Sequence, residues 1–277
     1  MEKMQSRRGV FKRLKNTLKY RAKMVIKGFR VLLFPGLPKK LCPPFVERLL
    51  FFFICVLSIL PFPLSYYENY LYLKIKRWAN RNFFTFQGRE YNYFVHKYNN
   101  TWRNERSVEV PIVYRIVQEF RGKNILEVGN VLSHYYPVNH DIVDKYEVAP
   151  GVMNIDVVDY KPAKKYDLIV SISTLEHVGW DERPREPLKV LRAVDNLRNL
   201  LIAGGELVVT LPIGQNPVLD KLIADNKIKF DKIYCMRRTG FNKWVETSYE
   251  EIKGHYFYGM PFPNANAIII GIIEKKE

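Results

Sequence analysis

The feature that most constrains the fold is a series of short, mostly apolar runs in the C-terminal part of the chain. These runs are Asn124–Val128, Tyr166–Ile172, Glu206–Leu211 and Ala267–Ile273. Because most of their successive positions are apolar, they predict strands that are buried on both faces. Helical periodicity separates them, so the sequence predicts an α/β domain with a mainly parallel sheet covered by helices on both faces.

Two helices are predicted beside these strands. The first covers 108–120, with Val108, Ile112 and Ile116 on one face and Pro111 in its first turn. The second precedes Glu206–Leu211 and ends at Gly204-Gly205. Its apolar side is made of Leu188, Leu191, Val194, Leu197 and Leu201.

The formal net charge of +16 is concentrated at the N-terminus. Residues 1–40 hold 13 lysines and arginines against one acid, and residues 41–99 hold seven against three. Residues 100–277 hold 24 of each sign. This balance argues against a protein whose main body is a nucleic-acid groove.

Residues 1–40 are predicted to form a basic amphipathic helix. Its apolar face is made of Phe11, Leu14, Leu18, Val25, Phe29 and Leu32. The lysines and arginines around that face suit an anionic membrane surface, at about 1 kcal/mol for each well-placed charge. RNA binding and packing against the chain's own domain are the alternatives.

Residues 41–65 are predicted to associate with a membrane. Leu49–Leu64 carries no charge, but Pro61 and Pro63 limit the uninterrupted helix to Leu49–Leu60. Such a helix is about 18 Å long, which is short of a hydrocarbon core of about 30 Å. A monotopic or re-entrant anchor on the cytoplasmic side is favoured, because the basic N-terminus should remain cytoplasmic. A single-pass span and a buried core helix are the alternatives.

Residues 66–106 are predicted to be an aromatic-rich linker before an α/β domain at 107–277. Thirteen aromatic residues lie between positions 66 and 102. Those next to the apolar segment suit the headgroup zone of a membrane. Those in Tyr91–Arg106 are expected either to close over a site as a lid or to pack between linker and domain.

The loop after the first strand reads LEVGNVLSHY, from Leu126 to Tyr135. Ligands of open α/β sheets bind at the carboxyl ends of the strands. A dinucleotide fingerprint needs glycine at 129, 131 and 134, whereas this chain has Gly129, Val131 and His134. The loop therefore disfavours NAD and FAD and favours a ligand with a nucleoside but no pyrophosphate.

Four segments, taken in order, resemble the class I S-adenosylmethionine-dependent methyltransferases over about residues 107–277. They are LEVGN (Leu126–Asn130), HDIVDKYE (His140–Glu147), NIDVVDYKPAKKYDLIVSISTLEHV (Asn154–Val178) and LLIAGGELVVTLP (Leu200–Pro212). The resemblance implies a Rossmann-like, mainly parallel seven-stranded sheet with helices on both faces. It also implies S-adenosylmethionine as the cofactor.

The resemblance implies a set of cofactor-binding residues at the strand ends. They are Glu127, Gly129, Asn130, Asp144, Asp156, Val157 and Ser173. By this analogy Glu127 and Gly129 hold the methionine end, Asp156 and Val157 meet the adenine, and Ser173 lies at the floor of the site.

Asp144 is the expected partner of the ribose hydroxyls, with Asp141 and Glu147 as rivals. The alternative role for Asp144 is to cap a helix. Val131 and Ser133 stand where family members often have glycine, which leaves room for a changed cofactor pose or a lost activity.

His177 with Glu176 is the first candidate for a base near the transferred methyl group, and His134 is the second. Each histidine has a structural hydrogen-bond donor as its alternative role. The candidate substrate contacts are Trp180, Asp181, Thr210 and Asn216. No metal site is expected, because the histidines do not cluster with acids and the cysteines (Cys42, Cys55 and Cys235) are scattered. The scattered cysteines also indicate a reducing compartment.

The sequence therefore predicts an S-adenosylmethionine-dependent methyltransferase at the cytosolic face of a membrane. Its expected acceptor is a small molecule, a lipid or a lipid-linked glycan, and its expected partner is an anionic membrane surface. A non-catalytic, membrane-tethered module is the alternative that the glycine-poor loop motivates. RNA methylation is a third reading, with the basic helix as RNA anchor.

Overall fold

The computed structural model describes residues 64–240 and 242–276. The chain divides into two compact units, Met1–Leu73 and Lys74–Glu277. The helix α3 (Leu64–Ala79) covers the end of the first unit and the start of the second.

The predicted basic helix at 1–40 lies outside the described residues, and so does the apolar segment at 41–65 except for its last two positions. Within the described part of the chain, no helix is both long enough and apolar enough to cross a bilayer.

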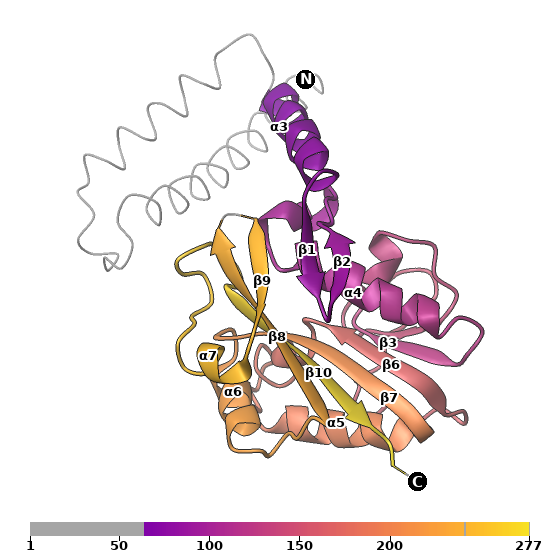
Figure 1. The fold of residues 1–277 in the computed structure, drawn as a ribbon. Helices are drawn as coiled ribbons and strands as arrows, with labels where there is room; N and C mark the ends of the chain where they lie inside the picture. Colours follow the sequence, from indigo (N-terminus) through magenta and orange to yellow (C-terminus); the bar gives the residue numbers. More distant parts are fainter. Residues whose placement is uncertain (1–63, 241, 277) are drawn as a thin grey trace, which may run out of the picture. The chain divides into compact units, whose positions relative to one another are not determined.

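An eight-stranded sheet forms the centre of the second unit (Figure 1). Across the sheet the strands are β5 (Val152–Met153), β4 (Asp141–Val143), β3 (Ile125–Val128), β6 (Tyr166–Ile172), β7 (Leu201–Pro212), β10 (Ala267–Glu274), β8 (Lys232–Gly240) and β9 (Lys243–Thr247). The first five strands are parallel, β10 is antiparallel to β7 and to β8, and β9 is antiparallel to β8.

This order confirms the prediction of a Rossmann-like α/β fold with a mainly parallel sheet, and it adds an eighth strand to the expected seven. From β3 the chain winds outward to β5 and then returns to β6 on the other side of β3. The carboxyl ends of β3, β4 and β6 therefore meet at the point where the winding reverses, which is where open α/β sheets bind ligands.

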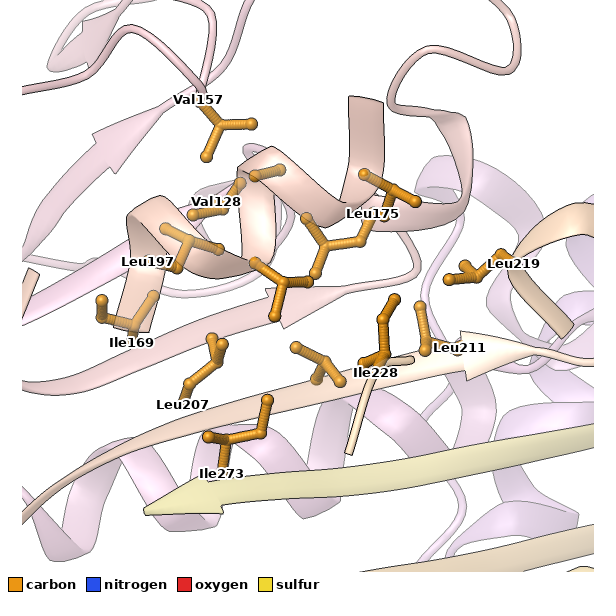
Figure 2. Close-up of a cluster of buried hydrophobic side chains, with 14 of the residues drawn as sticks. Val128, Val157, Ile169, Leu175, Leu197, Leu207, Leu211, Leu219, Ile228 and Ile273 are labelled. Carbon is orange, nitrogen blue, oxygen red and sulfur yellow. The ribbon is translucent and has the colours of Figure 1, made fainter. Parts of the chain in front are cut away.

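One face of the sheet is covered by α5 (Lys189–Leu200) and α6 (Pro217–Ala224). Figure 2 shows Leu197 of α5 and Leu219 of α6 packed among side chains of the strands. The predicted end of this helix at Gly204-Gly205 is wrong. Leu201 instead pairs with Tyr166 in the ladder of β6 and β7, so α5 stops at Leu200.

The opposite face is covered by α4 (Arg106–Glu119) and by a hairpin of β1 (Phe83–Phe86) and β2 (Arg89–Asn92). Pro111 lies inside α4, beyond its first turn, which corrects the predicted position. A proline has no N–H to donate to the carbonyl four residues earlier. That carbonyl, on Ser107, accepts the N–H of Phe94 at 2.9 Å instead.

The predicted linker at 66–106 is largely part of the folded unit, which begins at Lys74 and not at 107. The cause is burial, because Phe84, Phe86 and Tyr93 are only 3–6% exposed. The Tyr93 hydroxyl also accepts the N–H of Trp244 in β9 at 3.0 Å. Aromatic residues of the segment thus serve as core of the face that α4 covers.

Candidate active site

A cleft of about 460 Å³, including the solvent at its mouth, lies at the carboxyl ends of β3 and β4. Its lining residues are Val128, Gly129, Val143, Asp144, Lys145, Tyr146, Ile155, Asp156, Val157, Thr174, His177, Val178 and Glu182. Of the predicted cofactor residues, Gly129, Asp144, Asp156 and Val157 line the cleft, whereas Glu127, Asn130 and Ser173 do not.

Gly129 allows the loop after β3 to pass close to the turn after β6. Its φ is +85°, and a Cβ built there would lie 2.2 Å from the Thr174 hydroxyl oxygen. Any side chain would therefore strain the backbone and collide with Thr174. The glycine is required by this contact, independently of any ligand.

The backbone N–H groups from Gly129 to Leu132 in this loop all have acceptors within the protein. Gly129 N donates to the Val143 carbonyl at 2.8 Å, and Asn130 N donates to Asp144 Oδ2 at 3.3 Å. Val131 N and Leu132 N both donate to Glu127 Oε1, at 2.9 and 2.8 Å. Dinucleotide sites instead direct such N–H groups at a pyrophosphate.

Glu127 is fully buried, and both of its carboxylate oxygens have partners. Oε1 accepts the two loop N–H groups, and Oε2 lies 2.8 Å from Nε2 of the buried His140. The sequence resemblance gave this residue the methionine end of a cofactor. In the structure it holds the loop in shape, and His140 fixes the carboxylate.

Asp144 is the first residue after β4 and borders the cleft. Its Oδ1 accepts the N–H groups of Tyr146 and Glu147, both at 2.8 Å, and its Oδ2 accepts that of Asn130. Asp144 therefore caps this turn, and it does not cap a helix, which was its alternative predicted role. Because a carboxylate can accept about four hydrogen bonds, room for one ligand hydroxyl remains.

The rival acid Asp141 lies at the other end of β4, away from the cleft. There it pairs with Lys164 at 2.7 Å and accepts the hydroxyl of Tyr166 at 2.7 Å. These partners remove Asp141 from the candidates for the ribose.

At one end of the cleft, two acids each form ion pairs with the same two lysines. Asp156 pairs with Lys145 at 2.8 Å and with Lys189 at 2.5 Å, and Glu182 pairs with the same lysines at 2.7 and 2.6 Å. Burial raises the pKa of Asp156, but the lysine hydrogen bonds outweigh it and hold the pKa below its usual value. The carboxylate expected to meet the adenine is thus already neutralised by lysines.

The turn η4 (Leu175–His177) follows β6 and brings His177 to the cleft. His177 Nδ1 lies 2.6 Å from Asp181 Oδ2, so this acid orients the imidazole. Its Nε2 lies 3.6 Å from Glu176 Oε1, beyond hydrogen-bond distance. Trp180 does not line the cleft, and the Arg185 guanidinium lies over its ring at 4.3 Å.

A buried polar cluster lies behind the tip of β6. Ser173 has a left-handed backbone (φ 39°), and its hydroxyl donates to Glu109 Oε1 at 2.6 Å. Glu109 Oε2 pairs with Arg106 at 2.9 Å, and Arg106 caps the strand by donating to the Ile172 carbonyl. Thr210 Oγ1 accepts the N–H of Ser173 at 3.1 Å. Strained residues of this kind gather at functional sites.

Two further predicted residues meet at η4. Asn216 caps α6 by accepting the N–H groups of Val218 and Leu219, and its Nδ2 donates to the Glu176 carbonyl at 2.8 Å. Asn216 and Thr210 are buried and bonded within the protein. Both therefore support the site structurally, whereas the sequence predicted them as substrate contacts. Glu176 is 1% exposed, and burial raises its pKa well above the ordinary value.

His134 lies outside the cleft lining and beside the predicted lid. Its Nε2 is 2.9 Å from Glu147 Oε1 and 3.1 Å from the hydroxyl of Tyr98, whose ring stacks on the imidazole at 4.1 Å. Asn130 Nδ2 also donates to Glu147 at 2.8 Å. Tyr98 belongs to η2 (Tyr98–Arg103), so the lid segment touches the first loop here.

The sequence interpretation missed most of the partners of these residues. Glu109 and Arg106 are three apart at the start of α4, which was a visible signal. Lys189 and His140 reach their partners only through the fold. In the described ranges, no three histidine, cysteine or acidic side chains are arranged to hold a metal ion, although three histidines do pair with acids.

No family model and no curated protein matches the chain. Solved structures that match include the N-methyltransferase NodS from Bradyrhizobium japonicum in complex with S-adenosylhomocysteine, at 13% identity and a TM-score of 0.41, covering 62% of this chain and 88% of that one. A SAM-dependent methyltransferase from Archaeoglobus fulgidus matches at 14% identity and a TM-score of 0.41, covering 64% and 98%. The sugar N-methyltransferase KedS8 from Streptoalloteichus matches at 13% and 0.33, covering 70% and 98%. These similarities are too low to assign a function, which is therefore argued from the site.

Proposed function

We propose that this chain is an S-adenosylmethionine-dependent methyltransferase that acts on a small-molecule acceptor. One observation carries the proposal. The loop after β3 borders the cleft at the strand ends, yet its N–H groups from Gly129 to Leu132 are all bonded within the protein. Such a loop suits a nucleoside ligand without a pyrophosphate.

The cleft residues fit the parts of this cofactor. Asp144 would accept a ribose hydroxyl, Val157 and Ile155 would contact the adenine, and the turn at Gly129 would border the methionine end. The bound cofactor supplies a methyl group that is already activated by its sulfonium. The protein's task is therefore to align the acceptor and to exclude water.

For an acceptor that must lose a proton, His177 is the candidate base. Asp181 holds its Nδ1, which leaves Nε2 to take the proton. A positioned base of this kind contributes typically about 10²–10⁴-fold. An acceptor without a proton to lose would not need it.

Calorimetry of the full chain with S-adenosylhomocysteine tests the proposal, with NAD as the matched control. We expect the first ligand to bind and NAD, which carries a pyrophosphate, to give no heat. Absence of S-adenosylhomocysteine binding at millimolar concentration would overturn the proposal. Binding without any methyl transfer would favour the non-catalytic module.

For the location, we propose the cytosolic face of an anionic membrane, with a lipid or lipid-linked acceptor as the corresponding substrate class. The support is the sequence of residues 1–65, with its basic helix and apolar segment. Flotation of the full chain with anionic but not neutral vesicles is the expected result. RNA binding with a steep salt dependence, in place of flotation, would contradict it.

A further inference from the structure

Glu176 is a buried acid that pairs with no lysine or arginine among the described residues. The residue is 1% exposed, and its Oε2 atom has no hydrogen-bond partner among the described residues. Its other oxygen lies 3.6 Å from His177 Nε2. An unpaired buried polar atom is costly in a folded protein, so it calls for a ligand or a functional reason.

The neighbouring acids differ from Glu176 because each accepts a hydrogen bond from another residue. Glu109 is paired with Arg106 at 2.9 Å and accepts the hydroxyl of Ser173. Glu105 accepts the N–H of Ala265 at 3.1 Å, and its charge also acts on Arg238. Within the described chain, no lysine or arginine pairs with Glu176. Glu176 is therefore an acid of this cluster without a lysine or arginine partner among the described residues.

The position of Glu176 next to cleft residues suits a cationic group on the methyl acceptor. Its neighbours Thr174, His177 and Val178 line the cleft, whereas Glu176 does not. The charges that act on it belong to Glu109, Arg106 and Glu105, at the start of α4. Glu176 is thus buried beside the cleft lining, with its Oε1 3.6 Å from Nε2 of the cleft residue His177.

We propose that Glu176 binds the ammonium group of the methyl acceptor, so that the substrate class of this site is a primary amine. This inference rests on the proposed function. An ammonium group would donate a hydrogen bond to Oε2 and would place a positive charge beside this buried carboxylate. The acceptor nitrogen must also lose one proton to become a nucleophile, and Nε2 of the neighbouring His177 takes it. An N–H bond of the acceptor breaks, an N–H bond forms on the imidazole, and the electron pair stays on the acceptor nitrogen.

Ligand-detected NMR on the full chain tests the inference. The protein is saturated with S-adenosylhomocysteine and offered primary amines together with alcohols of the same carbon skeletons: phenethylamine with phenethyl alcohol, and glucosamine with glucose. We expect the amines to bind at least 10-fold more tightly than their alcohols. Glu176→Gln should remove this preference, and Glu186→Gln, the same change at an exposed glutamate paired with Arg192, should retain it.

The outcomes separate the two proposals. Equal binding of amines and alcohols, binding of neither, or a preference that survives Glu176→Gln overturns the amine assignment. A change in the ratio of S-adenosylmethionine to S-adenosylhomocysteine affinity in Glu176→Gln also overturns it, because the carboxylate would then serve the donor's sulfonium. Amine preference in a protein that binds neither nucleoside would overturn the proposed function alone.

Discussion

Glu127 and Glu176 are two buried glutamates near the carboxyl ends of neighbouring strands, and their surroundings are opposite. Glu127 receives two backbone N–H groups and faces His140, so each oxygen has a partner. Oε2 of Glu176 has no hydrogen-bond partner among the described residues. Because both are almost completely buried, exposure cannot explain the difference.

The comparison shows that burial alone does not identify a functional acid. A buried carboxylate whose hydrogen bonds are all made holds the fold, and Glu127 does this for the loop after β3. A buried carboxylate with an open acceptor keeps part of its bonding capacity for something else. We therefore expect the loop after β3 to be the rigid side of the site and the turn after β6 to be its reactive side.

The largest effect is expected from Glu127→Ala. The change leaves two loop N–H groups without their acceptor and His140 without its buried partner. Breaking a buried pair from one side costs about 3–5 kcal/mol. Chemical denaturation should therefore show a loss of this size. A loss below about 1 kcal/mol would mean that Glu127 does not hold the loop, and the comparison would fail.

Gly129→Ala should destabilise the rigid side by a second route. Gly122 is the matched control, because its φ is also +85° but no atom lies within 4 Å of a Cβ built there. Gly122→Ala should cost about 1 kcal/mol for the left-handed backbone alone. Gly129→Ala should cost at least about 1 kcal/mol more, because it also displaces Thr174. Equal losses in the two variants would show that the contact with Thr174 is unimportant.

The sheet was predictable because most of its strands are buried on both faces. The predicted run Tyr166–Ile172 has the same bounds as β6, and the predicted Ala267–Ile273 is one residue shorter than β10. The apolar runs missed four strands of the sheet. β4 and β5 are only three and two residues long. β8 and β9, at the opposite end of the sheet, carry lysine and arginine at several positions. An apolar-run criterion does not detect strands of that kind.

The cleft was predictable at the positions that strand ends define, such as Gly129 and Asp144. The partners of those residues were not, because they depend on side chains that only the fold brings together. Lys189 is 33 residues from Asp156, and Ser173 is 64 residues from Glu109. No spacing rule connects such pairs, so the sequence could propose Glu127 and Glu176 as site residues but could not tell them apart.

Asp144→Ala tests whether the acid at the end of β4 contacts the ligand. If Asp144 accepts a ribose hydroxyl, its loss should weaken S-adenosylhomocysteine binding by about 1–2 kcal/mol, or about 5–30-fold. Asp141→Ala is the control, because Asp141 lies at the other end of β4 and should leave the affinity unchanged. Calorimetry that finds equal affinity in both variants would remove Asp144 from the site.

The smallest effect on the free energy of unfolding is expected from Glu176→Gln. As the pH rises, this change should favour the variant, whereas the changes at Glu127 and Gly129 should only destabilise. Burial raises the pKa of Glu176 well above its ordinary value of 4.5, so the folded protein holds this proton more tightly than the unfolded chain does. The stability linked to that proton is complete below about pH 4.5 and is lost as the pH rises through the folded-state pKa. Glutamine does not titrate, so the variant should lose none of it.

The difference in unfolding free energy between Glu176→Gln and the unchanged protein should therefore shift in favour of the variant as the pH rises above about 4.5. Glu186→Gln, at an exposed glutamate, should show no such trend. A Glu176→Gln variant that is destabilised equally at every pH would behave as Glu127 is expected to behave. That result would mean that Glu176, too, is a fully bonded structural acid.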